Sequence, residues 1–493
     1  MMSFKPKRIP IRVGHRYVAI LNETSAEKLD VRASERIDLF VGKKELTAIV
    51  DITDNKELKD NQIGLFAETW DKLGVTSRNT IKVKVAPKPQ ADQHIKEKLE
   101  GERLTAKEMD IIVKDIVNDD LSDIEMTYFV AGCFTRGLSD RETADLTKAI
   151  VKHGGKLTFR HKIVMDKHCI GGVPGNRTTM LVVPMITALG YVMPKTSSRA
   201  ITSPSGTADT MEVVANVKND VDTLKKIAKK AGGFITWGGG VDLAAADDKL
   251  IRVRYPLKLD PQGMLLASIM AKKYSVSSNN VIIDIPMGDQ GKVKTKKEAN
   301  VLKKRFLRIA KLLGMKMKVV ITSADQPVGY GIGPLFEVED IMKILKNEPG
   351  APEDLKKKSI MLVTELLYLT GKYKFKYQAK KEARAVLETG KAWKQFQKIV
   401  KAQGKKRLPK RGEHTFVVKA KKAGTIKSIH NKLIANIART AGAPQDKGAG
   451  IIIHKKIGDI IKKGEPLYTV YTENKTRITY VKKLQYRKAY TIK

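Results

Sequence analysis

Between residues 157 and 405 the chain alternates short apolar runs with amphipathic helical runs, and this alternation strongly constrains the fold. The candidate strands are residues 161–167, 191–195, 232–238, 279–287 and 317–323, and the candidate helices include residues 221–231 and 379–402. Strands that alternate with helices in this way form a mostly parallel sheet with helices on its faces. Such sheets bind ligands at the carboxyl ends of their strands, so we expect a site in the loops that follow them.

The segment before this region predicts two more domains. Residues 1–86 read as a β-rich domain, because short alternating or β-branched runs (residues 9–14, 17–22, 35–41, 46–52 and 80–85) are separated by turn residues. Residues 93–156 have helical periodicity and predict a small helical bundle. Three S/T-x-x-E capping boxes mark its helix starts: Thr105–Glu108, Ser122–Glu125 and Ser139–Glu142.

The end of the chain predicts a fourth domain. Residues 412–493 return to short strands and glycine turns after a linker-like segment, which indicates a separate C-terminal α+β domain. The fold class is therefore a multidomain α/β protein, with residues 157–405 as its central α/β domain.

The composition excludes several classes of protein. Hydrophobic residues make up 42% of the 493-residue chain, as in globular proteins. No apolar run approaches the roughly 18–20 residues of a membrane helix, and the N-terminus lacks the apolar core of a secretory signal. Two cysteines, Cys133 and Cys169, cannot build a disulfide framework or a cysteine-based metal site. We therefore expect a cytoplasmic protein with no metal site.

The net charge of +40 raises nucleic-acid binding as an alternative function, because lysine and arginine neutralise phosphates. The competing interpretation is a lysine-coated surface that steers small anions toward an active site. The lysines are spread along the chain, and aromatic residues make up only 6%, so the sequence lacks the aromatic platform of single-strand binding proteins. Nucleic-acid binding is therefore not expected as the main function.

The segment from Lys195 to Val217 has the composition of an anion site. It carries four serines and four threonines and leads into a helical run near Ala208. Backbone N–H groups and the dipole at a helix N-terminus both favour a bound anion. Arg199 lies within the segment, and a guanidinium group can bind phosphate through two parallel hydrogen bonds. The alternative is a Ser/Thr-rich loop with an ordinary helix N-cap.

Residues 167–179, KHCIGGVPGNRTT, form a second candidate loop between a predicted strand and an apolar helical run. Glycines let the backbone approach an anion, and lysine adds a positive charge. The spacing matches neither the Walker A motif nor the dinucleotide fingerprint, so a tight strand-to-helix turn is the alternative. Because it precedes the Ser/Thr loop by one strand–helix unit, the two loops would lie at neighbouring strand ends.

Residues 237–273 carry a third group of polar side chains. Arg252 and Arg254 are two residues apart and would share one face of an extended segment, and Asp260 precedes a proline on a turn. Ser268 and Lys272 have i, i+4 spacing on the following helix and face the same way. These groups would suit the binding of a polar ring, and a capped surface helix is the alternative.

Several motifs in order resemble the thymidine/pyrimidine-nucleoside phosphorylase family. They are KHCIGGVPGN, SSRAITSPSGTADTMEV, AADDKLIRVRYPL, ASIMAKKYS, DIPMGDQGK and ITSADQPVGYGIGPLFEV, followed by the C-terminal GAPQDKGAGIIIHKKIGDIIKKGEPLYTVY. The resemblance covers roughly residues 93–480. The family pattern SGRG-L-x-x-TGGT-x-D-x-LE is replaced here by SSRAITSPSGTADTME. This departure, together with the extra β-rich domain, resembles an archaeal branch of the family that cleaves nucleoside 5′-monophosphates.

The resemblance implies a pentosyltransferase that performs reversible phosphorolysis, in which AMP and phosphate give adenine and ribose 1,5-bisphosphate, with CMP and UMP as further substrates. It implies that about residues 250–280 join the helical bundle. It implies these nucleotide contacts: Gly172, Ser198, Arg199, Ala200, Ile201, Thr202, Ser203, Thr207, Ser268 and Lys292. Further phosphate or base contacts are implied for Lys167, His168, Thr179, Ser197, Arg254 and Lys272. Cys169 stands where the family usually has serine.

For catalysis, the resemblance implies that Asp260 protonates the leaving base. A carboxylic acid can do this near neutrality only if burial or a nearby anion keeps it protonated. His168 is the rival acid, because an unperturbed histidine titrates near ~6.5. A packed histidine that holds the loop is the alternative role for His168.

Other family-level alternatives remain. A thymidine or uridine phosphorylase would carry the conventional loop residues, and a phosphoribosyltransferase on a related fold would need Mg²⁺ and an acidic pair near a GTGGD-like loop; neither signal is present. The resemblance implies a homodimer or larger homo-oligomer, inorganic phosphate as co-substrate, and no cofactor.

Overall fold

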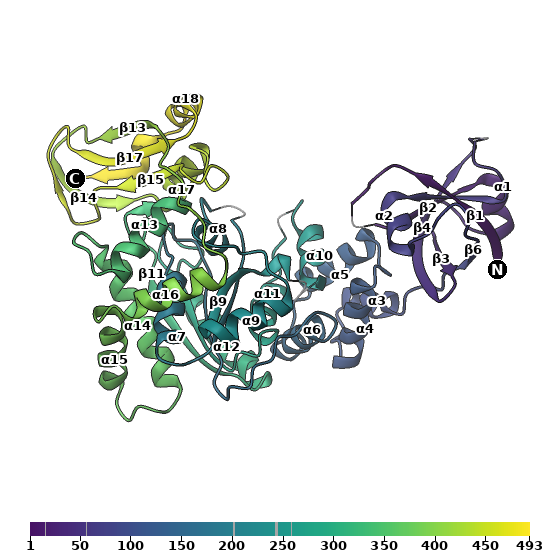
Figure 1. Cartoon of the computed structure of the whole chain (residues 1–493), viewed down its shortest axis with the longest axis horizontal. Coiled ribbons are helices and arrows are strands. Elements are labelled where there is room, and N and C mark those ends of the chain that lie inside the picture. Colours follow the sequence, from purple (N-terminus) through teal and green to yellow (C-terminus); the bar gives the residue numbers. More distant parts are fainter. Residues whose placement is uncertain (15, 56, 201–202, 242–244, 258) are drawn as a thin grey trace. The chain divides into compact units, whose positions relative to one another are not determined.

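The computed structural model describes residues 1–14, 16–55, 57–200, 203–241, 245–257 and 259–493. The chain forms two compact units, labelled by element in Figure 1. The first comprises residues 1–136 with 252–259, and the second comprises residues 137–251 with 260–493.

The N-terminal domain is a closed six-stranded barrel with the strand order β1-β5-β2-β4-β3-β6. Its elements are β1 (Met2–Ile9), β2 (Val18–Asn22), α1 (Glu23–Leu29), β3 (Arg36–Val41), β4 (Lys44–Thr53), β5 (Gln62–Phe66), α2 (Ala67–Leu73) and β6 (Ile81–Val85). Fully buried side chains such as Leu21, Ile37 and Leu39 fill it. The strand expected at residues 9–14 is wrong: β1 ends at Ile9, where Pro10, which has no N–H, cannot continue a ladder.

The predicted helical bundle is confirmed, and so are its three helix starts. The first unit contains α3 (Ala91–Glu100), α4 (Ala106–Val117) and α5 (Asp123–Thr135), and the second unit contains α6 (Asp140–Lys152). Thr105, Ser122 and Ser139 each accept a hydrogen bond from the backbone N–H of the glutamate three residues later, which closes the capping box. Within the second unit, α11 (Gln262–Tyr274) packs along α6.

The central domain contains the expected parallel sheet. Strands β11, β10 and β7 pair in parallel, β8 pairs in parallel with β9, and a parallel bridge between Val164 and Val192 connects the two sets. The strands are β7 (Met165–Cys169), β8 (Met193–Ser197), β9 (Gly233–Trp237), β10 (Asn280–Met287) and β11 (Lys316–Ser323). All five chain segments therefore run in one direction.

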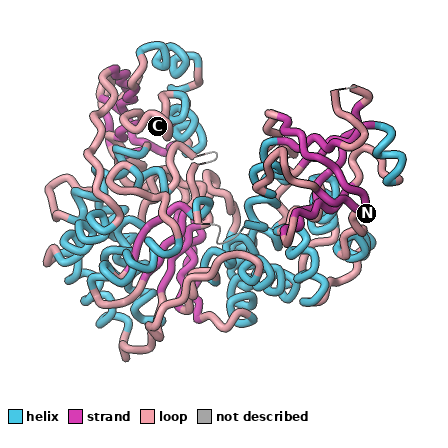
Figure 2. The backbone as a smooth tube through the Cα atoms, turned by 45° about the vertical axis from the view of Figure 1, so that its right-hand side comes forward, coloured by secondary structure: helices cyan, strands magenta, loops and turns pink. Residues whose placement is uncertain are grey.

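Helices surround these strands, as Figure 2 shows by colour. They are α7 (Thr179–Ala188), α8 (Thr207–Glu212), α9 (Val221–Ala231), the 3-10 turn η1 (Gly238–Gly240), α10 (Ala245–Arg254), α12 (Lys296–Leu312), α13 (Pro334–Leu345), α14 (Glu353–Leu369), α15 (Lys376–Glu388) and α16 (Lys391–Ala402). The predicted helix over residues 379–402 is divided at Gly390, which has a φ of 72°. Helix α7 is almost entirely buried, in keeping with its apolar sequence.

The larger sheet of the C-terminal domain includes one strand from the central domain. Its sheets have the orders β12-β15-β17-β13 and β16-β14-β18, and β12 (Gly331–Ile332) belongs to the chain before α13. The other elements are β13 (His414–Lys419), β14 (Gly424–Ile429), α17 (Asn431–Thr440), β15 (Gly450–Ile453), β16 (Ile460–Ile461), β17 (Pro466–Thr472), α18 (Lys475–Lys483), the 3-10 turn η2 (Tyr486–Ala489) and β18 (Tyr490–Ile492). The predicted multidomain α/β fold class is confirmed. In the described part of the chain, helices are too short or too polar to cross a bilayer.

Buried polar contacts hold β12 against the neighbouring elements. Asp340 on α13 accepts hydrogen bonds from the backbone N–H groups of Tyr330 and Gly331, each at 2.7 Å. Lys456 donates to the backbone oxygens of Pro327 at 2.6 Å and Gly329 at 2.5 Å. Burial raises the pKa of the Asp340 carboxyl from 3.8 to about 6, although the two N–H groups oppose this shift.

This pKa predicts a pH-dependent contribution to stability. Because the folded pKa lies above the unfolded one, the native state binds the proton more tightly, and stability falls as the pH rises from about 4 to 6. We expect Asp340→Asn to remove up to about 3 kcal/mol of this dependence. Urea unfolding of both proteins at pH 4.5 and 7 measures the difference. The exposed Asp222→Asn is the control, and a wild-type pH dependence in Asp340→Asn would contradict the prediction.

Candidate active site

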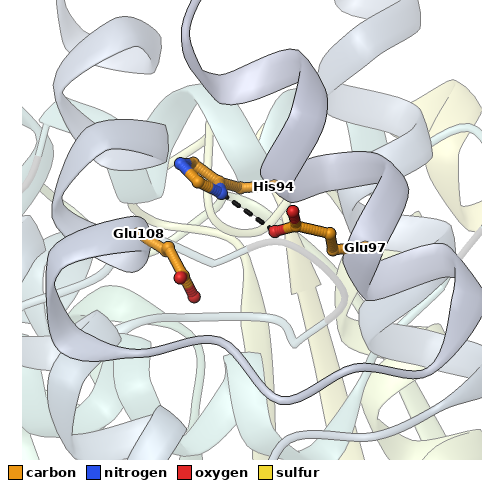
Figure 3. Close-up of side chains that lie close together, drawn as sticks. All are labelled: His94, Glu97 and Glu108. Carbon is orange, nitrogen blue, oxygen red and sulfur yellow. Dashed lines mark hydrogen bonds and ion pairs between the residues drawn. The ribbon is translucent and has the colours of Figure 1, made fainter.

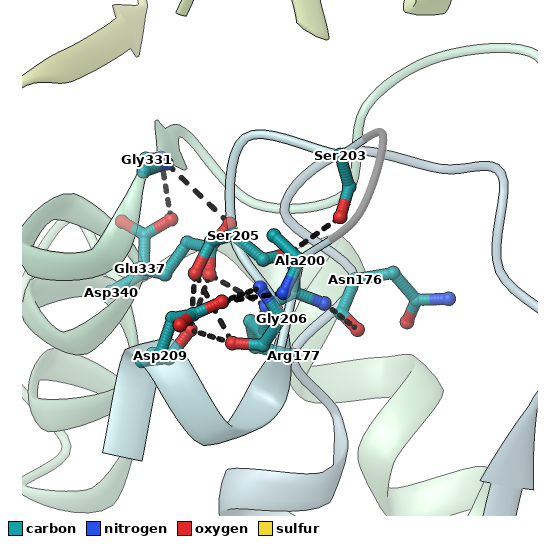
Figure 4. Close-up of polar contacts among 12 residues, drawn as sticks. Asn176, Arg177, Ala200, Ser203, Ser205, Gly206, Asp209, Gly331, Glu337 and Asp340 are labelled. Carbon is teal, nitrogen blue, oxygen red and sulfur yellow. Dashed lines mark hydrogen bonds and ion pairs between the residues drawn. The ribbon is translucent and has the colours of Figure 1, made fainter. Parts of the chain in front are cut away.

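Three loops meet at the carboxyl ends of β7, β8 and β10. Arg177, in the loop after β7, donates a hydrogen bond to the backbone oxygen of Ser205, in the loop after β8 (Figure 4). A Cβ added to Gly172 would lie 3.0 Å from the backbone nitrogen of Lys292, in the loop after β10. The parallel sheet thus gathers three polar loops that are far apart in the sequence.

The glycine-rich loop after β7 is built on a buried lysine. Lys167 is 1% exposed, and its Nζ donates to Thr178 Oγ1 at 2.6 Å. Burial lowers the pKa of Lys167, although Cys169 and Asp284 oppose this shift. Gly171 and Gly172 have φ values of 85° and 95°, which favour glycine, and Thr179 is the buried first residue of α7.

His168 and Cys169 are both half-buried at the end of β7. Burial and the neighbouring lysines, Lys273 first, lower the pKa of His168 well below 6.5. Burial and Asp284 raise the pKa of the Cys169 thiol. The Cys169 sulfur accepts hydrogen bonds from the Gly171 N–H at 3.4 Å and from Asn176 at 3.3 Å. The thiol therefore supports the shape of the loop.

A buried carboxylate joins three elements beneath the loops. Asp166 on β7 is fully buried and lies 3.5 Å from Lys195 Nζ on β8 and 2.7 Å from Lys273 Nζ on α11. Burial lowers the pKa of Lys195 well below its ordinary value, against the attraction of Asp166. These charges are internal to the protein and fix the strand ends from which the loops leave.

Arg199 has two carboxylate partners within the protein. Its guanidinium group donates to Asp209 at 3.0 Å and to both oxygens of Glu212 at 2.7 Å, and it lies over the Trp237 ring. Lys447 pairs with Glu212 at 3.2 Å. Hydrogen bonds to Arg199, aided by Lys447 against burial, lower the pKa of Glu212 to about 2. Arg199 thus binds two internal carboxylates in this structure, and its contact with a phosphate group stays a prediction.

Asp209 shapes the Ser/Thr loop from inside (Figure 4). One of its carboxylate oxygens accepts from the Ala200 N–H at 2.7 Å and from the Gly206 N–H at 2.9 Å. A Cβ on Gly206 would lie 2.6 Å from the Ser198 oxygen and 2.7 Å from the Ala200 nitrogen, so only glycine fits. The helical run expected near Ala208 is helix α8, which begins at Thr207 and is six residues long.

The hydroxyl groups of this loop differ in exposure. Ser197 is buried at the end of β8, Ser198 is exposed, and Thr207 is half-buried. Ser203 donates to the backbone oxygen of Ser205 at 3.0 Å. The implied contacts Ile201 and Thr202 lie outside the described residues.

Glu337 on α13 ties the first two loops together. It accepts from Arg177 Nε and from Thr210 Oγ1, each at 2.6 Å. Its side chain is fully buried, so this ion pair is shielded from water. Neither Glu337 nor Asp209 was predicted as part of the site. Each is separated in the sequence from the arginine that it binds, Arg177 for Glu337 and Arg199 for Asp209, so the sequence gave only a weak indication of these pairings.

The third polar segment is helical, which changes its geometry. Arg252 and Arg254 lie on α10, so residues two apart do not share a face, and the expected extended pair is wrong. Arg254 is buried, and both arginines belong to the first unit. Ser268 and Lys272 on α11 do face the same way, because Lys272 Nζ donates to Ser268 Oγ at 3.3 Å.

The remaining implied residues are exposed. Asp260 lies directly before Pro261 and α11, and Lys292 lies in the loop after β10. Lys292 Nζ would be 3.9 Å from a Cβ added to Gly171, so this ammonium lies beside the glycine-rich loop.

One group within the described residues could hold a metal ion by distance. Ligand atoms of His94, Glu97 and Glu108 lie within 4.8 Å of one another in the first unit (Figure 3). Local structure already uses each of them: Glu97 accepts from Gln93 and lies 2.9 Å from the His94 ring nitrogen, and Glu108 closes the capping box of α4. We assign no metal to this group.

Models of known protein families match three parts of the chain. Residues 92–154 match the helical bundle domain of a glycosyl transferase family, and residues 161–393 match its a/b domain. Residues 425–493 match the C-terminal domain of pyrimidine nucleoside phosphorylases. Anthranilate phosphoribosyltransferase from Thermus thermophilus has a related fold, with a TM-score of 0.54 and 16% identity over 63% of this chain and 98% of that one. These domains define a glycosyl transferase of the nucleoside phosphorylase class.

The sequences of several known proteins align with nearly the whole chain. AMP phosphorylase 1 of Archaeoglobus fulgidus is 41% identical over 97% of this chain and 94% of its own length, and AMP phosphorylase of Methanococcoides burtonii is 40% identical over 97% and 94%. A Legionella pneumophila relative, provisionally named a thymidine phosphorylase, is 37% identical over 96% and 92%. The chain belongs to the family of AMP and thymidine phosphorylases, which confirms the sequence-based resemblance.

The tight packing of Gly206 generates a prediction. We expect Gly206→Ala to weaken the binding of inorganic phosphate by about 10- to 100-fold, because the added Cβ would push the Ser198–Ala200 backbone away and disrupt one or two charge-assisted hydrogen bonds. Isothermal titration calorimetry measures this affinity. Gly238→Ala is the matched control, because Gly238, like Gly206, has no positive φ, and a Cβ added there would lie no closer than 3.7 Å to its neighbours. Unchanged affinity in Gly206→Ala would show that this loop does not hold the phosphate.

Proposed function

We propose that the protein is a pentosyltransferase that cleaves nucleoside 5′-monophosphates with inorganic phosphate. AMP and phosphate would give adenine and ribose 1,5-bisphosphate reversibly, and CMP and UMP would be further substrates. The observation that carries the proposal is the meeting of three Gly-, Ser-, Thr- and Lys-bearing loops at one edge of the sheet. The full-length similarity to AMP phosphorylases supports it.

The reaction needs places for two phosphate groups, and the loops offer polar groups for both. Inorganic phosphate would contact Lys167, Gly172, Thr179, Ser197 and Thr207. Lys292, exposed beside Gly171 and Gly172, would meet the 5′-phosphate of the substrate. The nucleotide would also contact residues 198–203 and Ser268. A lysine ammonium suits a phosphate as a point charge.

The bond changes follow from this arrangement. An oxygen of inorganic phosphate forms a bond to C1′ of the ribose while the bond from C1′ to the base nitrogen breaks. The sugar carries positive charge in the transition state, so the adjacent phosphate dianion stabilises it electrostatically. The departing base takes the electron pair and must gain a proton at its nitrogen.

We assign proton donation to Asp260 rather than to His168. The lowered pKa of His168 leaves its ring neutral near pH 7, so it has no imidazolium proton to give. The rings of neutral histidines instead suit packing and hydrogen bonding.

Several further properties belong to the same proposal. The family resemblance supports a homodimer or larger homo-oligomer in the cytoplasm, with inorganic phosphate as co-substrate and no cofactor. Sedimentation of the purified protein tests the assembly. Neither a membrane nor a nucleic acid takes part in the proposed reaction.

The substrate assay decides between the proposed activity and nucleoside phosphorolysis, which the Legionella relative favours. We expect chromatography to detect base release from AMP, CMP and UMP only when phosphate is present, and none from adenosine or thymidine. Omission of phosphate is the internal control. Release from thymidine alone would make the protein a thymidine phosphorylase, and release from no substrate would overturn the proposal.

Substitution of the two acid candidates tests the proton donor. We expect Asp260→Asn to lower kcat for AMP by about 10²- to 10⁴-fold, the usual contribution of a general acid. We expect His168→Gln to keep the wild-type pH profile between pH 6.5 and 8, because burial and the neighbouring lysines hold the pKa of the native ring well below 6.5. Full activity of Asp260→Asn, or loss of a titration step in His168→Gln, would reverse the assignment.

A further inference from the structure

Asp247 lies beside the two α11 residues expected to meet the base, although neither the sequence motifs nor the family resemblance gave it a role. It sits on α10 and is only 2% exposed. Ser268 Oγ donates to Asp247 Oδ2 at 2.6 Å, and Lys272 Nζ lies 3.3 Å from the same oxygen. All three residues belong to the second unit.

The contacts determine which hydrogen-bonding groups remain for a ligand. A serine hydroxyl has one proton and two lone pairs, and a carboxylate only accepts. Ser268 therefore gives its proton to Asp247 and accepts from Lys272 at 3.3 Å. Among the contacts of the described residues, this leaves Ser268 one lone pair. The Lys272 ammonium has three protons, and those directed at Ser268 and Asp247 leave one.

We propose that Asp247 is a positioning residue that fixes the hydrogen-bond polarity of the base subsite. It makes the Ser268 hydroxyl an acceptor beside the Lys272 ammonium, which can only donate, so the site reads a base edge on which an N–H group lies next to an acceptor. The inference rests on the proposed function and names the chemical feature that the subsite selects. Adenine offers an amino group beside a ring nitrogen, cytosine offers the same pair, and uracil offers a ring N–H beside a carbonyl.

The polarity has a consequence for substrates that lack the donor. Purine riboside 5′-monophosphate has the adenine ring without the amino group, so Ser268 would face a carbon-bound hydrogen. The Asp247→Asn substitution allows the reverse polarity, because the introduced amide NH2 can donate to Ser268 and release the hydroxyl proton toward the base. The preference for the amino-bearing base would then fall.

The test compares kcat/KM for AMP and purine riboside 5′-monophosphate in the wild type and in Asp247→Asn. For each protein, the preference is kcat/KM for AMP divided by kcat/KM for purine riboside 5′-monophosphate. Dividing the wild-type preference by that of Asp247→Asn cancels the different intrinsic reactivity of the two bases. We expect the preference for AMP to fall about fivefold to tenfold in Asp247→Asn, as for one lost hydrogen bond. Asp248→Asn, an exposed neighbour on α10, is the control and should keep the wild-type preference.

A second variant separates positioning from a general structural effect. In a Ser268→Ala background, Asp247→Asn should leave the preference between the two substrates unchanged, because Asp247 acts through the missing hydroxyl. An equal effect of Asp247→Asn with and without Ser268 would overturn the inference. A wild type inactive on every monophosphate would instead overturn the proposed function.

Discussion

The buried carboxylate of Asp166 is the interaction on which the site depends. It faces Lys195 on β8 and Lys273 on α11, so one charge on β7 links three elements. Each of those elements adjoins or contains a segment of the candidate site. Strand β7 leads to the glycine-rich loop, strand β8 leads to the Ser/Thr loop, and helix α11 carries Ser268 and Lys272. Removing one partner from a buried ion pair typically costs about 3–5 kcal/mol, because the remaining charge is left without compensation. The positions of all three segments are therefore coupled energetically.

Above this anchor, the Ser/Thr loop is held by charges that the protein supplies itself. Asp209 binds two loop N–H groups, and Arg199 neutralises both Asp209 and Glu212. Lys447 of the C-terminal domain forms a further ion pair with Glu212. If an anion binds here as proposed, the Ala200 and Gly206 backbone that Asp209 holds is already in place, so little conformational freedom of these two residues would be lost on binding.

Local signals in the sequence predicted local structure well. The capping boxes at Thr105, Ser122 and Ser139 each need only four consecutive residues, and all three formed. The parallel sheet followed from the alternation of strands and helices. The roles of Arg199 and Asp247 could not be predicted, because their partners are set by tertiary contacts: Glu212 is 13 residues from Arg199, and Ser268 is 21 residues from Asp247. Composition shows that an arginine can bind phosphate, but only the packed structure shows which carboxylates already occupy it.

Because of strand β12, the C-terminal sheet includes residues that precede the sequence boundary of the C-terminal domain. A fragment beginning near residue 412 would lack β12, and the backbone edge of β15 that pairs with Gly331 and Ile332 would be open. Exposed strand edges invite pairing with other chains. The apolar sequence of β15, Gly450–Ile453, would make that exposed edge prone to aggregation. A fragment that keeps this sheet complete must therefore contain the chain segment before α13 as well as the C-terminal residues.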